Sequence, residues 1–313
     1  DRAGNMFAIR PGSDPARSIV ASGSHLDTQP HGGRFDGISG VLAALEAVET
    51  LNDAGIETTA PLAVVNWTNE EGVRYAPGLL GSAWYAGTVT DAALSGIRTT
   101  DGMLFDDEAR LRGWLGDSSQ KIPLAAFLEL HIEQGPVLER EEKQVGVVTS
   151  VQGLTWLDVS VSGTDAHAGT TPLDHRQDAL LAALNEAGLE CGPAARVSVG
   201  RLKTATDGPS TIVGEAAFVI DIRHPDAGTL AGLTAKCTAI CETLADQSGC
   251  TATVAQRISV SPTQFDARCI RALEAGAGRR GYAYRKIASG ALHDAANIAK
   301  VVPTAMVFVP CRD

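Results

Sequence analysis

The sequence predicts an α/β protein with a mostly parallel sheet, interrupted by a smaller inserted α+β domain. The first observation is the order strand, loop, helix, strand within the first 70 residues, which is typical of a parallel sheet with crossover helices. The second is a change near residue 150, where strands with one exposed face replace buried strands. The third is the return of α/β character after Pro262, with a helix predicted over residues 267–280.

Two apolar runs open the predicted sheet. Residues 18–22 form a strand that ends at His25, and residues 62–67 form a second strand that ends just before Glu70. A glycine-rich loop, HGGRFDGISG, and a helix predicted over residues 41–51 connect them. Because open α/β sheets bind ligands at the carboxyl ends of their strands, we expect the site at this edge.

The inserted segment has the order β, α, β, β, α, β, which indicates a small α+β layer. Its predicted elements are strands over 157–161, 196–202, 216–223 and 251–260, and helices over 178–189 and 230–246. We therefore expect a discontinuous catalytic domain over residues 1–149 and 262–313, and an inserted domain over residues 150–261.

The composition excludes some classes of partner. With 26 Lys and Arg against 37 Asp and Glu, the net charge of −11 argues against nucleic acid or an anionic membrane. No apolar run is long enough to span a membrane, and the first ten residues lack the pattern of a signal peptide. The six cysteines lack C-x-x-C spacing, which favours free thiols in a reducing compartment, so we expect a cytoplasmic protein.

The first histidine motif, SHLDT, lies at the end of a predicted strand. Imidazole is a common metal ligand, and Asp27 lies on the same face as His25, where it would orient the ring. Alone, this spacing is a weak signal and favours a satisfied core histidine over a metal ligand. Asp36 in the glycine-rich loop has two interpretations, since a carboxylate there would bridge two cations or cap the following helix.

The adjacent residues Glu70 and Glu71 are unfavourable in a protein core, because two like charges close together repel and resist burial. A dinuclear metal site needs such a pair, with one carboxylate as ligand and one as base, although a solvated turn before a glycine is the plainer alternative. Apolar and polar residues alternate over residues 126–133, so Glu129, His131 and Glu133 share one face of a predicted strand. Burying three ionisable side chains on one face is costly unless they contact water, a metal ion or polar partners.

A third histidine, His293, lies at a predicted loop-to-helix entry in SGALHDA. Capping explains the following Asp294 better than it explains the histidine. Three histidines with three or four carboxylates, each at a strand end or loop of one predicted sheet, form a nitrogen and oxygen ligand set. Such a set suits zinc, manganese or cobalt and disfavours calcium.

The chain resembles the hydantoinase/carbamoylase branch of the M20 metallopeptidase-like amidohydrolases. The matching segments are GSHLDTQPHGGRFDGISGVLAALE, NWTNEEGVRYAPGLLGS, LELHIEQGPVLE, AHAGTTPLDHRQDAL, DIRHPD and SGALHDA. The resemblance implies a dinuclear catalytic domain, an inserted lid and dimerisation domain, and a homodimer. It also implies that the family's usual first and last helices lie outside this numbering.

The resemblance implies a role for each matching residue. His25 and His131 would bind one divalent ion, and Glu71 and His293 the other. Asp36 would bridge the two ions. Glu70 would be the general base that activates the water and then protonates the leaving nitrogen.

Four further residues follow from the same resemblance. His167 would stabilise the oxyanion, although a lone loop histidine is the plain alternative. Arg223 would hold the substrate carboxylate, or form a salt bridge at a strand end. Gln134 would contact the substrate or serve the loop backbone. Ser210 stands where the family usually has a substrate-contacting asparagine, which puts the usual substrate in question.

Leu292 is a second departure, because it replaces a glycine that lets the backbone approach the substrate. Its side chain would narrow the pocket or point away. The leading hypothesis is hydrolysis of an N-carbamoyl amino acid, with two zinc, manganese or cobalt ions per chain. The alternatives are an allantoate or ureidoglycolate amidohydrolase, an M20 aminoacylase or dipeptidase, and a binding protein that has lost the chemistry.

Overall fold

The computed structural model describes residues 1–116, 121–167, 192 and 194–311. These residues form two compact units: Asp1–Val151 with Gln264–Asp313, and Gln152–Thr263. No helix in the described residues is long and apolar enough to cross a membrane.

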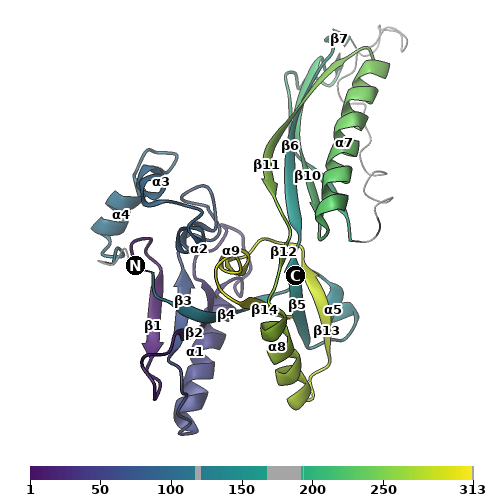
Figure 1. Ribbon diagram of the computed structural model, residues 1–313. Helices are drawn as coiled ribbons and strands as arrows, with labels where there is room; N and C mark the ends of the chain where they lie inside the picture. Colours follow the sequence, from purple (N-terminus) through teal and green to yellow (C-terminus); the bar gives the residue numbers. More distant parts are fainter. Residues whose placement is uncertain (117–120, 168–191, 193, 312–313) are drawn as a thin grey trace. The chain divides into compact units, whose positions relative to one another are not determined.

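The first unit is built on one sheet (Figure 1). Its strands are β1 (Met6–Arg10), β2 (Ile19–His25), β3 (Leu62–Trp67), β4 (Leu124–Ile132), β5 (Val145–Val151), β12 (Thr263–Gln264), β13 (Tyr284–Ser289) and β14 (Thr304–Val309). Their order is β1-β3-β2-β4-β14-β5-β12, and β13 pairs with β5. The pairs β2–β3, β2–β4, β4–β14 and β5–β13 are parallel, which confirms the predicted α/β class with a mainly parallel sheet.

Seven helices of the first unit are described: α1 (Ile38–Asp53), α2 (Leu80–Ala86), α3 (Asp91–Gly96), α4 (Phe105–Leu111), α5 (Val137–Arg140), α8 (Ala267–Arg279) and α9 (Asp294–Ile298). α1 packs against β2, β3 and β4, while α8 packs against β5 and β14. The core beneath them includes Trp67, Phe127 and Phe308, all buried. Trp67 and Phe127 meet edge to face at 5.6 Å, a favoured aromatic geometry.

The parallel register aligns the carboxyl ends of the central strands. His25, the last residue of β2, is paired with Trp67, the last residue of β3. Ser22 is paired with Leu128 of β4, so continuing the parallel register brings His25 level with His131. The polar segments that follow these strands therefore gather at one edge of the sheet, as the sequence led us to expect.

The second unit has a four-stranded antiparallel sheet in the order β11-β6-β10-β8, and a short pair, β7–β9. Its elements are β6 (Gly153–Ser162), β7 (Ala166–His167), β8 (Arg196–Thr204), β9 (Thr211–Ile212), β10 (Glu215–His224), α7 (Ala227–Gln247) and β11 (Thr251–Val260). In Figure 1, α7 lies along one face of this sheet, where Leu157, Ile220 and Leu233 form the core. The helix predicted over residues 178–189 lies outside the described residues.

Candidate metal centre

Three buried histidines lie at the carboxyl-end edge of the first sheet. His25 ends β2, His131 lies near the end of β4, and His293 precedes the first residue of α9. Their exposed fractions are 1%, 1% and 2%. The ring centroids of His25 and His131 are 5.8 Å apart, and those of His131 and His293 are 4.5 Å apart. Three imidazoles so close together and so deeply buried are difficult to explain by packing alone.

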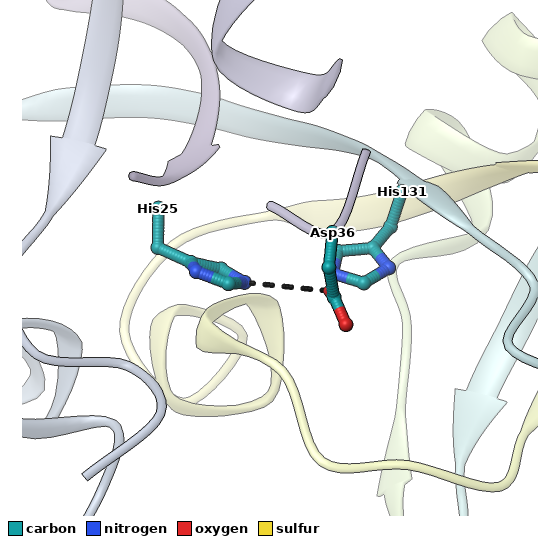
Figure 2. A group of neighbouring side chains, drawn as sticks. All are labelled: His25, Asp36 and His131. Atoms are coloured by element: carbon teal, nitrogen blue, oxygen red, sulfur yellow. Dashed lines mark ion pairs between the residues drawn. The ribbon is translucent and has the colours of Figure 1, made fainter. Parts of the chain in front are cut away.

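Asp36 lies between two of these histidines (Figure 2). Its Oδ1 is 3.0 Å from Nε2 of His131 and 4.0 Å from Nε2 of His25. Its Oδ2 accepts a hydrogen bond of 2.9 Å from Nε2 of Gln134. The helix α1 begins after Gly37 without a side-chain cap, so the capping interpretation of Asp36 is wrong. The side chain of Gln134 therefore contacts the carboxylate of Asp36.

Backbone carbonyls fix the tautomers of two histidines. Nδ1 of His25 is 2.9 Å from the carbonyl oxygen of Asp27, and Nδ1 of His131 is 2.9 Å from that of Ile132. A carbonyl only accepts, so each Nδ1 carries a hydrogen, and in the neutral ring the lone pair is on Nε2, which faces Asp36. Lone pairs facing a carboxylate oxygen need a proton or a cation between them. This geometry is that of a metal-binding imidazole with an oriented second nitrogen.

The Glu70–Glu71 turn is held by the carboxylate of Asp27. Its Oδ1 accepts from the backbone N–H of Glu70 at 3.1 Å, and its Oδ2 from that of Glu71 at 3.0 Å. Oε2 of Glu70 then lies 3.7 Å from Nε2 of His25. Asp27 thus orients the His25 ring through its backbone carbonyl, while its side chain positions the two glutamates.

Three groups of ligand atoms in the described residues lie within 4.8 Å of one another. They are His25, Asp36 and His131; Glu129, His131 and His293; and His25, Glu70 and Glu71. Glu71 is therefore grouped with His25 and Glu70, and its side chain accepts a 2.8 Å hydrogen bond from Gln29. The described groups do not bring Glu71 and His293 together around one position.

Ser289 fixes the ring of His293. Its Oγ lies 2.9 Å from Nε2 of His293 and 2.9 Å from the carbonyl oxygen of Ala291, and it accepts from the Ala291 N–H at 3.1 Å. The single hydroxyl hydrogen goes to the carbonyl, so Nε2 of His293 must donate to Oγ. His293 consequently presents Nδ1 as its lone pair, the opposite tautomer from His25 and His131.

Glu129 is a buried member of the centre that the sequence-based prediction left out of the site. It is fully buried, and Ser24 Oγ donates to its Oε1 at 2.7 Å while the Ala295 N–H donates to its Oε2 at 2.9 Å. The signal was its position two residues before His131, on the same face of β4.

Without a cation, the buried carboxyl groups of the centre favour their neutral forms. Burial, followed by the charges of Asp294 and Glu129, raises the pKa of Glu70 to about 10. Burial, followed by the charge of Glu129, also raises the pKa of Asp294 well above its usual value. Burial opposes protonation of His131, yet the hydrogen bond with Asp36 raises its pKa. Burial, followed by the charges of His131 and His25, lowers the pKa of His293.

Divalent cations fit this arrangement. Among the residues that the structure describes, no lysine or arginine forms an ion pair with Asp36, Glu70 or Glu129. Convergent imidazole nitrogens and buried carboxyl oxygens suit zinc, manganese or cobalt. Calcium, which prefers oxygen ligands alone, suits them poorly.

The remaining predicted residues lie in several places. Arg223 on β10 forms a two-pronged ion pair with Asp221, with both contacts at 2.8 Å, so the salt-bridge interpretation describes at least part of its contacts. Ser210 is exposed in the turn before β9. Leu292 is partly buried and packs against the core of the first unit. His167 lies in β7, and its side chain is outside the described part of the structure.

Known proteins with similar sequences show that the chain belongs to peptidase family M20/M25/M40. The model of peptidase family M20/M25/M40 matches residues 21–313. The chain is 41% identical to N-carbamoyl-L-amino-acid amidohydrolase of Rhizobium meliloti over 318 residues, 99% of this chain and 76% of the relative. Allantoate amidohydrolase of Bacillus subtilis is 30% identical, over 100% of this chain and 78% of the relative. An amidase of the hydantoinase/carbamoylase family from Burkholderia multivorans has a crystal structure with a TM-score of 0.96 and 43% identity, covering 100% of this chain and 78% of that one.

Proposed function

We propose that this chain, which belongs to peptidase family M20/M25/M40, is a hydrolase of the carbamoyl C–N bond in N-carbamoyl amino acids. The observation that carries the proposal is the convergence of His25, Asp36 and His131 beside the carboxylate of Glu70. The likeness to an N-carbamoyl-L-amino-acid amidohydrolase supports N-carbamoyl amino acids as the substrate class. In this reaction one ureido acid and one water give ammonia, carbon dioxide and the free amino acid.

The proposed centre holds two divalent ions. His25 and His131 would bind one ion, Glu71 and His293 the other, and Asp36 would lie between them. When bound, zinc, manganese or cobalt supplies a polarised water that ionises near neutral pH. The two histidines are prepared for this role, because their Nδ1 hydrogens are already engaged by backbone carbonyls.

Glu70 is the proposed proton carrier. It would take a proton from the attacking water and deliver it to the leaving nitrogen, which requires an ionised carboxylate at the start. Burial, followed by the neighbouring carboxylates, favours the neutral acid, and neighbouring cations would act in the opposite direction. The chemistry of Glu70 is therefore coupled to the presence of the cations.

Residues of the second unit would bind the substrate. Arg223 would hold the carboxylate of the amino acid, since a guanidinium fork fits a carboxylate with two hydrogen bonds. His167 would donate to the oxygen that becomes negative during attack. Gln134 would contact the substrate, and Ser210 and Leu292 would set the size and polarity of the pocket.

Hydrolysis of allantoate is the second candidate, because the 30% identical relative from B. subtilis is an allantoate amidohydrolase. Both candidates share the ureido group and the release of ammonia. They differ in the acid that carries the group, which is where Arg223 and Ser210 would act.

Ammonia release from a small panel of compounds tests the proposal. The panel contains N-carbamoyl-β-alanine, several N-carbamoyl-L-amino acids, allantoate and an N-acetyl amino acid, each with manganese or zinc added. The Glu70→Gln variant controls for contaminating activity. We expect the wild type, but not the Glu70→Gln variant, to release ammonia from N-carbamoyl amino acids. Release from allantoate alone would favour the second candidate, and release from none with metal bound would contradict both.

We also propose a cytoplasmic homodimer in which the second unit supplies both lid and dimer contacts. A two-fold symmetric dimer is the commonest arrangement of soluble homo-oligomers. Light scattering at assay concentration should give twice the chain mass, and a monomer would contradict this arrangement.

A further inference from the structure

We propose that Glu129 is a positioning residue of the metal centre, whose buried carboxylate holds the three histidine-bearing segments in one arrangement. The proposal rests on the proposed function in one respect, namely that the three histidines bind metal. Glu129 itself needs no contact with substrate to act in this way.

Glu129 contacts each segment that carries a histidine. Its Oε1 accepts from the hydroxyl of Ser24 at 2.7 Å, and the next residue on β2 is His25. Its Oε2 accepts from the N–H of Ala295 at 2.9 Å, two residues after His293. On its own strand, Glu129 lies two residues before His131 and shares its face. One carboxylate therefore joins three segments that are far apart in the sequence.

The chemistry of this position indicates a role for charge. Glu129 has an exposed fraction of 0%, and an isolated ionised carboxylate is very costly to bury. Its two hydrogen-bond donors are neutral, so they satisfy its oxygens without neutralising it. Its ligand atoms lie within 4.8 Å of those of His131 and His293, where a cation would neutralise it. A glutamine or an apolar side chain would fill the same volume without this cost.

Asp294 is another fully buried carboxylate near the centre, but among the described residues no hydrogen bond links either of its oxygens to a histidine-bearing segment. Glu133 offers a matched comparison on the other side of His131. Its two oxygens accept from the backbone N–H groups of Val137 and Leu138, both at 2.8 Å, at the start of the short helix α5. Glu133 thus accepts two hydrogen bonds, as Glu129 does, but connects no histidine-bearing segment.

Titration with Co²⁺ tests the proposal on the full chain. Metal-free wild type, Glu129→Gln and Glu133→Gln are compared by calorimetry and by the visible absorption of bound Co²⁺. The glutamine at position 129 can still accept from Ala295 and donate to Ser24, so it removes the charge while keeping the hydrogen bonds. We expect a loss of Co²⁺ affinity of roughly tenfold to a hundredfold and an altered spectrum, as for other residues that orient metal ligands. Glu133→Gln should stay within about twofold of wild type.

The outcomes separate the two proposals. If wild type binds Co²⁺ and Glu129→Gln matches its affinity and spectrum, the role of Glu129 is refuted and the metal centre stands. If wild type binds no Co²⁺, both proposals fail. Should Glu129→Gln not fold, Ser24→Ala removes one of the hydrogen bonds to Glu129 and keeps the charge. A folded Ser24→Ala variant with wild-type affinity and spectrum would then refute the positioning role, and weaker binding would support it.

Discussion

Replacing Glu70 with glutamine should stabilise the metal-free protein at neutral pH. Burial, followed by the charges of Asp294 and Glu129, raises the pKa of Glu70 from 4.5 to about 10. At pH 7 the carboxyl group is then protonated in the folded protein and ionised in the unfolded chain. The stability from this raised pKa is fully present below about pH 4.5 and is lost as the pH rises toward 10. Between these two pH values the free energy of unfolding falls by about 1.4 kcal/mol for each pH unit, so about 3 kcal/mol has been lost at pH 7.

Glutamine has the shape of the protonated acid and does not titrate, so the variant avoids this loss. The difference in free energy of unfolding between Glu70→Gln and wild type should be about 1 kcal/mol at pH 5, about 3 at pH 7 and about 5 at pH 8. Urea unfolding of chelator-treated proteins at these three pH values measures it. The same substitution at Glu46, an exposed residue of α1, is the control and should show no such trend. A difference for Glu70→Gln that does not change with pH would refute the reasoning.

Three further predictions concern the centre and the substrate. Gly37→Ala should weaken Mn²⁺ affinity at least about tenfold in calorimetry, because a Cβ at φ +70° would overlap the ring of His25; Gly55→Ala, at φ +62° with open space around it, is the control and should bind normally. Arg223→Ala should raise KM roughly tenfold to a hundredfold for N-carbamoyl acids, with little change for the corresponding neutral amides; equal effects on both would remove Arg223 from carboxylate binding. Chelation should abolish ammonia release and added zinc, manganese or cobalt should restore it, so activity that survives complete metal removal would contradict the proposed chemistry.

Two of the strands that lead to the site could be predicted from the sequence because each contains an apolar run. The apolar run at residues 62–67 coincides with β3, and the run that ends at His25 with β2. Three helices between β3 and β4 were not predicted, because α2, α3 and α4 have only seven, six and seven residues. Six of the residues of α2 are buried, so the helix lacks the polar face by which a sequence pattern is recognised.

The burial of β4 was harder to read from its sequence. Alternation correctly divides its residues between two faces, but the apolar Leu128 and Leu130 are only partly buried, while Glu129 and His131 are fully buried. Hydrophobicity alone would bury the two leucines and expose the glutamate and the histidine. The proposed cation-binding centre would change this balance, because ligands and the groups that hold them must be taken out of water together.

Asp27 shows why side-chain roles at such a site cannot be taken from spacing alone. The pattern H-x-D predicted that Asp27 orients His25, and Nδ1 of His25 lies 2.9 Å from the carbonyl oxygen of Asp27 and 3.6 Å from its carboxylate Oδ1. The same carboxylate also accepts from the N–H groups of Glu70 and Glu71, a contact that the spacing did not predict. One residue therefore fixes both a histidine at the end of β2 and the glutamate pair after β3. Because these contacts join neighbouring strands, the distance between His25 and Glu70 depends on the register of the sheet. The proposed base and the proposed ligand are positioned by the fold itself, and a shift of either strand would separate them.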